Sequence, residues 1–393
     1  MVGVGRRESG VSPEPPPRSR DRALRSLAPT HETAGLFREA STSVRWLMVA
    51  LDAPGPRGGI QRYLAELVAR TPGVDVLAPE GRTGWAAVPG LAWRAHRRLA
   101  AGGYTGLIVA HLKLAAALPA LLACHPLPAV VLAYGMEVTC GRFKALERWG
   151  LARASRVVPV SEYTGRLLVR IGVPADRVRC VTPGVALPAE SPAEPHAPGL
   201  RLLSVGRLER SEGYKGHDRV LAALPALVAR FPGLKWEVVG SGSALPDLAR
   251  QVRDAGMGEH VLLRGSVAED ELARCYRRAD VFVLPTRHLH DAAGDRFEGF
   301  GIVYLEAAAH GCPAVAGRDG GGAEAVADGE TGLVVDADEP GALVAALGRL
   351  LADPELRRRM GEAARRRVAE RFTWEHAARN LAGVLAEAAP CAC

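Results

Sequence analysis

Residues 298–306 read Glu298-Gly299-Phe300-Gly301-Ile302-Val303-Tyr304-Leu305-Glu306, so that two glutamates stand eight positions apart around a glycine-containing loop. The apolar run 281–285 comes before this segment and is typical of a buried parallel strand that ends at proline. Residues 303–310 have the composition of a helix, and Gly311 follows where a left-handed C-cap is favoured. A strand, a glycine loop and a helix start leave backbone N–H groups free for phosphate. The segment therefore predicts an anion site within an α/β fold.

The two glutamates indicate that the ligand carries hydroxyl groups as well as phosphate, as a nucleotide sugar does. On one continuous helix they would lie about 12 Å apart along its axis, which suits contacts with two parts of one ligand. The alternative is that Glu306 is an ordinary surface residue of a helix and Glu298 a solvated charge near its N-terminus. The neighbouring motifs decide between these interpretations.

The chain has 393 residues, which is enough for two domains that each bury a core. Short apolar strands alternate with helical stretches on both sides of a proline-rich segment, as in doubly wound parallel sheets. We therefore predict an α/β protein with domains at 44–186 and 200–372 and a linker at 187–199. Residues 373–393 are assigned to a C-terminal helix and tail that could pack back on the first domain. The expected strands are 44–51, 107–110, 129–132, 156–160, 200–205, 236–239, 261–263, 281–285 and 332–335.

The net charge of +7 comes partly from a leader at 1–43 that is rich in proline, serine and arginine. This leader lacks the apolar core of a secretory signal and is predicted to be disordered. Arginine clusters at 357–359 and 365–367 favour solvated helix faces, with weak attraction to an anionic membrane surface as the alternative. No aromatic-basic pattern of a nucleic-acid reader accompanies the charge, so we predict no nucleic-acid partner.

The chain has no run of 18 or more uncharged apolar residues, which argues against a transmembrane span. Its seven cysteines are scattered and odd in number, which is typical of thiols in a reducing compartment. We therefore predict a cytoplasmic protein, with peripheral contact at the inner membrane face as an option.

Two short segments contain residue types that commonly bind metal ions. Asp336-Ala337-Asp338 precedes a proline and is better explained as the N-cap region of a helix. His288-Leu289-His290-Asp291 offers imidazole and carboxylate groups, but no companion ligand is evident, which favours ordinary loop residues.

A second motif, residues 206–216, places Arg207 and Lys215 just beyond the predicted strand 200–205. Ligands of open α/β sheets bind in the crevice at this end of the strands. Arginine offers a planar fork to phosphate oxygens and lysine a compact charge, so the pair suits a diphosphate.

Several motifs occur in an order that resembles GT-B retaining glycosyltransferases of family 4. They are Gly206-Arg207-Leu208 with Lys215-Gly216, the segment 298–306, and Gly320-Gly321-Gly322-Ala323-Glu324. Residues 53–60 resemble the family's N-domain glycine loop and residues 181–185 its pre-linker signature, so the resemblance covers about residues 44–385. The sequence of residues 298–306 is most similar to the corresponding segment of GDP-mannose-dependent mannosyltransferases that act on phosphatidylinositol mannosides. The implied fold is two Rossmann-like domains that face a cleft.

The resemblance also implies roles for individual residues. Arg207 and Lys215 would bind the donor diphosphate and neutralise the leaving group without a metal ion. Glu306 would accept hydrogen bonds from the ribose, and Glu298 from the transferred sugar. The other implied donor contacts are Phe300, Gly301 and Ile302 at the phosphate and sugar, Val267 at the base, and Gly58 and Gly59 at the phosphates.

The sequence departs from the family pattern at Tyr134, where many relatives carry a histidine beside the reacting sugar. Tyrosine can form hydrogen bonds but is not a base near neutral pH without help. His111 could take part of that catalytic role, or it could be a core or loop histidine. In the same-face mechanism that the resemblance implies, the leaving phosphate accepts the acceptor's proton, so loss of the histidine need not abolish activity.

The implied activity is hexose transfer that uses no metal ion or other cofactor. The expected donor is GDP-mannose, with UDP-glucose or UDP-N-acetylglucosamine as alternatives, and the acceptor is a lipid or a small molecule. Tyr134 favours an alternative of another class, a protein that binds a nucleotide sugar without transferring it. The presence of all four charged residues, Arg207, Lys215, Glu298 and Glu306, argues against this alternative. A membrane-docking or scaffold role, based on the basic leader and helices, is the third hypothesis.

Overall fold

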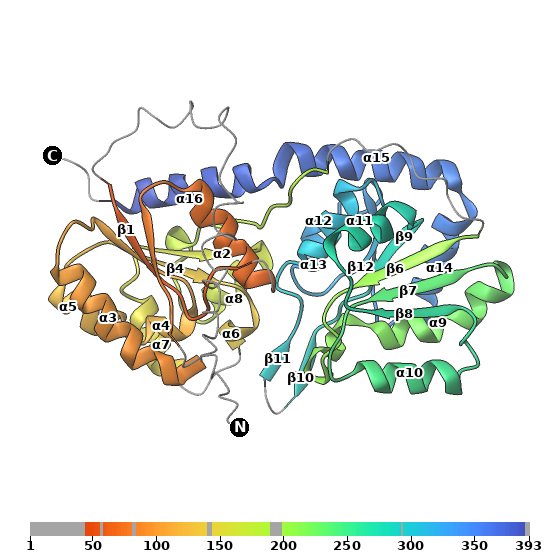
Figure 1. The fold of residues 1–393 in the computed structure, drawn as a ribbon, viewed down its shortest axis with the longest axis horizontal. Coiled ribbons are helices and arrows are strands. Elements are labelled where there is room, and N and C mark those ends of the chain that lie inside the picture. The colour runs from red at the N-terminus through yellow and green to blue at the C-terminus, as the bar shows by residue number, and fades with distance from the viewer. Residues whose placement is uncertain are drawn as a thin grey trace, which may run out of the picture. The chain divides into compact units, whose positions relative to one another are not determined.

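The computed structural model describes residues 44–55, 58–80, 84–139, 144–188, 199–291 and 294–389 (Figure 1). The predicted leader, positions 189–198 of the predicted linker, two positions of the glycine loop and the end of the tail lie outside the described residues. The described chain contains two parallel sheets, each of which alternates with helices. The predicted α/β class with two parallel-sheet domains is therefore confirmed.

The first domain is built on a five-stranded parallel sheet of order β2-β1-β3-β4-β5. Its strands are β1 (Trp46–Val49), β2 (Val74–Leu77), β3 (Gly106–Val109), β4 (Ala129–Ala133) and β5 (Arg156–Pro159). Its helices are α2 (Gly59–Arg70), α3 (Val88–Ala100), α4 (Leu112–Ala115), α5 (Leu118–Cys124), α6 (Met136–Thr139), α7 (Lys144–Leu151) and α8 (Glu162–Arg170), with 3₁₀ turns at Gly84–Ala87 and Ala175–Arg177.

The second domain is built on a six-stranded parallel sheet of order β13-β12-β9-β6-β7-β8. Its strands are β6 (Arg201–Val205), β7 (Lys235–Val239), β8 (Val261–Gly265), β9 (Val281–Leu284), β12 (Ala314–Gly317) and β13 (Gly332–Val335), and a separate hairpin pairs β10 (Leu289–Asp291) with β11 (Gly294–Arg296). Its helices are α9 (His217–Arg230), α10 (Leu245–Asp254), α11 (Glu269–Arg278), α12 (Ile302–Ala309), α13 (Gly322–Ala325), α14 (Pro340–Ala352) and α15 (Pro354–Arg371), with a 3₁₀ turn at Arg210–Lys215. The last helix, α16 (Trp374–Ala388), follows α15.

Both faces of the central strands of each sheet are buried, because alternate residues of a strand enter different apolar clusters. Leu47 and Val49 of β1 enter one cluster, whereas Trp46 and Met48 enter another. The strands are therefore apolar at successive positions, as in parallel sheets covered by helices on both sides. This explains why continuous Val/Leu runs located most of the strands in the sequence.

The sequence analysis missed four strands: β2, β10, β11 and the buried β12, whose sequence is Ala314-Val315-Ala316-Gly317. The edge strand β2 has the sequence Val74-Asp75-Val76-Leu77 and is only partly buried, so it lacks the continuous apolar run of the other strands. Of the segment 288–291, predicted to be a loop, Leu289–Asp291 instead form β10 of the hairpin β10–β11, where Leu289 pairs with Arg296, and His288 lies in the loop before it. The loop prediction was wrong because cross-strand pairing, rather than an apolar run, forms this hairpin.

Helix α16 packs on α2 and β4 of the first domain (Figure 1). Trp374, at the start of α16, is buried with its ring 6.4 Å from that of Tyr63 in α2. Arg70 in α2 forms an ion pair with Glu375 at 2.9 Å. No helix in the described part of the chain combines the length and apolar character that a bilayer crossing requires.

Candidate active site

A cavity of about 340 Å³ lies where loops of the two sheets meet. The first domain contributes the start of α2 and the loop after β4, and the second contributes the loop after β6 and the segment before α12. Both loops follow the carboxyl ends of parallel strands, where α/β proteins bind ligands. Of the residues predicted to bind or react with the donor, the cavity brings together Gly58, Gly59, Tyr134, Arg207, Lys215, Glu298, Phe300, Gly301 and Ile302.

The predicted cation pair is organised by a residue that the sequence analysis did not select, Glu212. Lys215 Nζ donates to Glu212 Oε2 at 2.6 Å, and the Arg207 guanidinium is hydrogen-bonded to Glu212 Oε1. The Lys215 and Glu212 side chains are only 9% and 6% exposed, whereas that of Arg207 is 70% exposed. Lys215 is therefore a fixed charge, and Arg207 is accessible to an incoming anion. The i,i+3 spacing of Glu212 and Lys215 in one motif was the available sequence signal.

The loop that carries Glu298 leads directly into α12. Gly301 stands at the N-cap with φ of 81°, a conformation that favours glycine, and Ile302 begins the helix. Gly299 touches the other domain, because a Cβ there would lie 2.1 Å from the carbonyl oxygen of Tyr134. Gly321 N–H donates to the Glu298 carbonyl at 2.7 Å, which connects the glycine motif 320–324 to this loop. The glycines therefore allow three chain segments to meet at the cavity.

The Glu298 carboxyl group has a pKa raised above its ordinary value, chiefly because burial disfavours its charged form. Lys215 opposes that rise, Glu212 adds to it, and the N–H groups of Phe300 and Gly299 oppose it. Hydroxyl groups that donate to this carboxylate would stabilise its charged form further. Glu298 can therefore act as an acceptor for hydroxyl groups inside the cavity.

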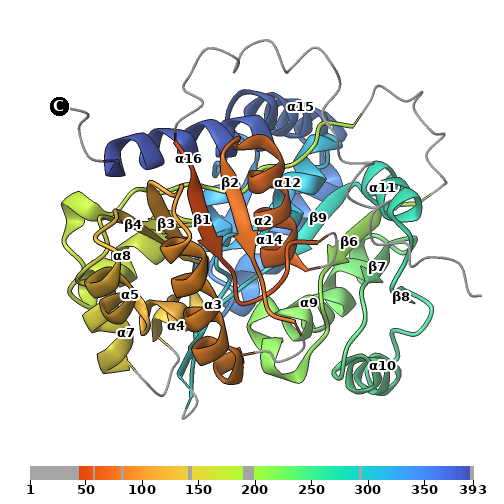
Figure 2. The same ribbon diagram turned by 60° about the vertical axis from the view of Figure 1, so that its left-hand side comes forward.

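Glu306 lies on α12 but does not line this cavity. Its Oε1 accepts from Arg62 of α2 at 2.8 Å, and its Oε2 accepts from the Tyr276 hydroxyl at 2.9 Å. Figure 2 shows α2 and α12 near each other, in agreement with the Arg62–Glu306 pair. The pair connects the two domains, since α2 belongs to the first and α12 to the second.

The contacts of Tyr134 and His111 are structural in this conformation. The Tyr134 hydroxyl donates to the Ala110 carbonyl at 2.9 Å, and burial raises its pKa well above its ordinary value. His111 caps α4, because its Nδ1 accepts from Lys113 N–H at 3.1 Å. Burial first, and then the Lys113 charge, lower the His111 pKa to about 4, which keeps the ring neutral near pH 7. His111 does not line the cavity but lies behind Tyr134, with ring centroids 6.1 Å apart.

Two further residues, Val267 and Glu137, differ in whether they line the cavity. Val267 is partly buried against the core and does not line the cavity. Glu137, which the sequence analysis did not select, does line it, and its Oε1 accepts from Tyr134 N–H at 2.5 Å. Burial raises the Glu137 pKa. Its place three residues after Tyr134 gave no sequence signal of a buried carboxylate.

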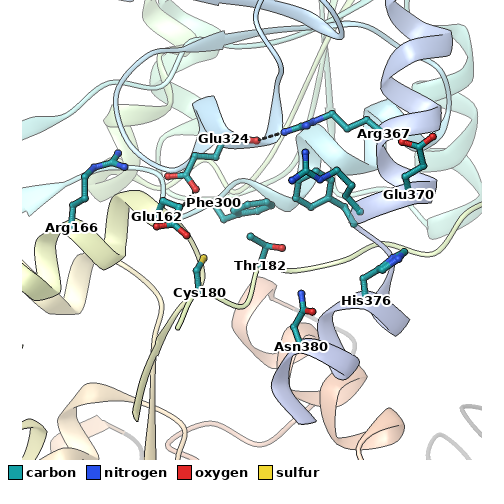
Figure 3. Close-up of a pocket in the computed structure, with 12 residues that line it drawn as sticks. Glu162, Arg166, Cys180, Thr182, Phe300, Glu324, Arg367, Glu370, His376 and Asn380 are labelled. Atoms are coloured by element: carbon teal, nitrogen blue, oxygen red, sulfur yellow. Dashed lines mark hydrogen bonds between the residues drawn. The ribbon is translucent and has the colours of Figure 1, made fainter. Parts of the chain in front are cut away.

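A larger cavity of about 620 Å³ lies on another side of the domain junction (Figure 3). Here Glu324 accepts from the backbone N–H groups of Glu162 and Tyr163 at 2.8 and 2.6 Å, and Arg367 donates to the Glu324 carbonyl at 3.2 Å. Glu324 thus caps α8 of the first domain from the second. We take the smaller cavity as the candidate active site, because it holds the predicted cations and Glu298.

The sequence matches two family models in succession. Residues 47–187 match the model described as Glycosyltransferase Family 4, and residues 193–367 match Glycosyl transferases group 1. The chain is 32% identical to a GDP-mannose-dependent alpha-(1-6)-phosphatidylinositol monomannoside mannosyltransferase of Mycobacterium tuberculosis, over 87% of this chain and 98% of that protein. It is 42% identical to the protein of the same description from Mycolicibacterium smegmatis, over 45% of this chain and 46% of that protein.

Solved structures share the fold. HepE of Anabaena, crystallised with UDP and glucose, aligns with a TM-score of 0.68 and 18% identity over 87% of this chain and 99% of that one. Sucrose-phosphate synthase of Thermosynechococcus elongatus aligns with a TM-score of 0.69 and 22% identity over 88% and 98% of the two chains. Together with the full-length relative, these matches show that the chain belongs to glycosyltransferase family 4 and has the GT-B fold.

Proposed function

We propose that this glycosyltransferase moves mannose from GDP-mannose to a phosphatidylinositol mannoside or a related lipid, with retention of anomeric configuration. The observation that carries the proposal is the convergence of Arg207, Lys215 and Glu298 in one cavity between the domains. The names of the mycobacterial relatives support the donor and the acceptor class.

In the proposed reaction, the bond from the sugar C1 to the diphosphate oxygen breaks while a bond from C1 to the acceptor hydroxyl oxygen forms. The hydroxyl proton passes to the departing diphosphate. Negative charge grows on that diphosphate, and Lys215 and Arg207 are the cations that would stabilise it. Glu298 would hold hydroxyl groups of the mannose, and the N–H groups at the start of α12 would face the phosphates.

Donor identity is tested by thermal shift with GDP, UDP and ADP, each with and without its sugar. A bound ligand raises the melting temperature by linkage, and GDP-mannose should do so most. A larger shift with UDP-glucose or UDP-N-acetylglucosamine would replace GDP-mannose with that donor. If no nucleotide shifts the melting temperature, the transferase proposal fails. Binding of a donor without sugar transfer to any acceptor would favour the non-transferring alternative.

The stereochemical course is tested by NMR of the product anomer. Retention is expected, and inversion would assign the role of base to a cavity carboxylate such as Glu137. Transfer should continue in excess EDTA, because the proposed stabilising charges are side chains. Loss of donor turnover in EDTA, with recovery on added Mg²⁺, would contradict metal-independent transfer.

A lipid acceptor requires access to a membrane surface, and the first domain exposes two tryptophan–arginine pairs that we propose as its docking patch. Trp93 of α3 and Trp149 of α7 are 59% and 50% exposed, and both helices contact α5. Arg97 lies over the Trp93 ring at 5.0 Å and Arg153 over the Trp149 ring at 4.3 Å. Indole rings and arginines suit an anionic headgroup region. We therefore propose that the enzyme works in the cytoplasm at the inner membrane face.

Vesicle sedimentation tests this docking. Anionic phosphatidylglycerol vesicles should retain the wild-type enzyme and release the variant with Trp93→Ser and Trp149→Ser, whereas neutral vesicles should retain neither. Equal retention of both proteins would rule out the patch as the docking surface.

A further inference from the structure

The hairpin β10–β11 gathers two histidines and an aspartate outside the donor cavity. His290 and Asp295 are direct partners across the strands, with Nδ1 2.7 Å from Oδ1. His288 Nε2 lies 3.6 Å from Asp295 Oδ2. One ligand atom from each of the three residues lies within 4.8 Å of the others. Two imidazoles and a carboxylate are a donor set that first-row transition metals use in proteins.

His288 is oriented as a metal ligand would be. Its Nδ1 is 2.7 Å from the Tyr163 hydroxyl, and its buried Nε2 has no hydrogen-bond partner among the described residues. The Phe297 ring lies 5.2 Å away and the His290 ring stacks at 4.2 Å, so the imidazole has a partly apolar surround. Metal-ligating histidines typically bind the ion through one ring nitrogen while the other forms a hydrogen bond.

The hydrogen bond to Tyr163 fits this role, because a ring that donates from Nδ1 to the Tyr163 oxygen directs the lone pair of Nε2 to the cluster.

We propose that His288, His290 and Asp295 bind one divalent transition-metal ion of the zinc class, with Tyr163 as the residue that positions His288. Tetrahedral zinc with bonds of about 2.0–2.1 Å separates its ligand atoms by about 3.4 Å. The observed 3.6 Å between His288 and Asp295 is close to that value. His290 Nδ1 contacts the other carboxylate oxygen, Oδ1, at 2.7 Å, and its side chain, which is 71% exposed, can shift so that the ligand atoms, which lie within 4.8 Å of one another, reach that spacing. Water would fill the fourth position.

Such an ion would connect the two domains. Tyr163 belongs to α8 of the first domain, whereas the hairpin belongs to the second. Phe297 touches His288 and also lines the donor cavity, one residue before Glu298. The bound ion would therefore hold the segment that leads into the catalytic loop, without taking part in the donor chemistry proposed above.

The test is titration of the full chain with zinc chloride by calorimetry, and with cobalt chloride by visible absorption. All proteins carry Cys140→Ser, Cys391→Ser and Cys393→Ser, so that thiols outside the described residues do not bind the metal. We expect one site per chain and cobalt bands of tetrahedral geometry. His290→Gln should lower zinc affinity at least about 100-fold, and Tyr163→Phe about 10–100-fold. His290 is exposed, so the metal-free melting temperature should not change.

The matched control is His96→Gln, because His96 and His125 form the second histidine pair, with ring nitrogens 3.0 Å apart. That variant should bind zinc normally. Absence of stoichiometric zinc uptake, unchanged affinity in His290→Gln, or loss of uptake in His96→Gln would each overturn the proposal. The first two outcomes would leave His290 and Asp295 as a plain hydrogen-bonded pair. Zinc binding is measured in the absence of a nucleotide sugar, so failure of the zinc proposal is distinct from failure of the transferase proposal.

Discussion

Replacing Lys215 with methionine separates its role in stability from its role in donor binding. The Lys215 ammonium is buried against Glu212 at 2.6 Å, so the substitution keeps side-chain volume but removes one charge of a buried pair. Removing one partner of such a pair costs about 3–5 kcal/mol. Arg207 still contacts Glu212, so we expect the lower end, about 3 kcal/mol. If the second domain unfolds as one unit, this corresponds to a fall in melting temperature of about 6–12 °C.

The double variant Lys215→Met with Glu212→Gln distinguishes the two roles. With the uncompensated carboxylate removed, most of the lost stability should return, because apolar or neutral replacement of a whole buried pair is close to neutral. Affinity for the nucleotide diphosphate should stay low in both variants. A charge-assisted hydrogen bond contributes about 1.5–3 kcal/mol, which corresponds to a loss of about 10–100-fold.

The assay combines melting curves with calorimetric titration of GDP and UDP, on the wild type and both variants. Two results would refute the reasoning. If the double variant melts as low as the single one, the uncompensated Glu212 charge is not the source of instability. If either variant binds the nucleotide as tightly as wild type, Lys215 does not contact the diphosphate.

Three other substitutions test the site and the domain junction. Glu298→Gln should lower turnover while GDP or UDP affinity stays nearly normal. Because the pKa of Glu298 is raised in the folded state, its charge reduces stability as pH rises above about 4.5. The variant should therefore melt at a higher temperature than wild type at pH 7 and at the same temperature near pH 4. A variant that melts lower at pH 7 would contradict the burial argument. Tyr134→Phe should lower the free energy of unfolding by about 1 kcal/mol and change turnover only a few-fold. A loss of turnover above about 100-fold would indicate that the Tyr134 hydroxyl is catalytic. Glu324→Ala should cost about 1–2 kcal/mol of stability, because two N–H groups of α8 lose their acceptor. Glu370→Ala, at an exposed residue of the same larger cavity, should change stability by less than about 0.5 kcal/mol. Equal effects of the two substitutions would argue against a capping role for Glu324.

The sequence was sufficient for the fold where one physical signal dominated. Strands buried on both faces carry continuous apolar runs, and nearly all of these were located. The edge strand β2, which contains Asp75, and the hairpin β10–β11 lack that signal, because they form through cross-strand pairing and are not apolar runs buried on both faces. The same limit applies to the site. Motifs located Arg207, Lys215 and Glu298, because their types and spacing carry chemistry locally.

Contacts across the domain junction were not predictable from local pattern. Arg62 pairs with Glu306 over 244 positions, and Glu324 caps α8 over 162 positions. Likewise, Asp295 completes the cluster of His288 and His290 only because the hairpin register places it opposite His290. A search of the sequence for a companion ligand had no reason to select it. Tertiary placement, rather than residue type, assigns these roles.

The two glutamates of residues 298–306 have different hydrogen-bond partners, which matters for donor binding. Glu306 already accepts from Arg62 and Tyr276, although each carboxylate oxygen retains a second lone pair for a ribose hydroxyl. Glu298 has its charge opposed by burial, so hydroxyl donors would stabilise it. A ligand that engaged both would therefore stabilise the charged form of one carboxylate and alter a contact between the domains at the other. Since α12 follows Glu298 directly and carries Glu306, donor binding and the domain contact would be coupled through a single helix.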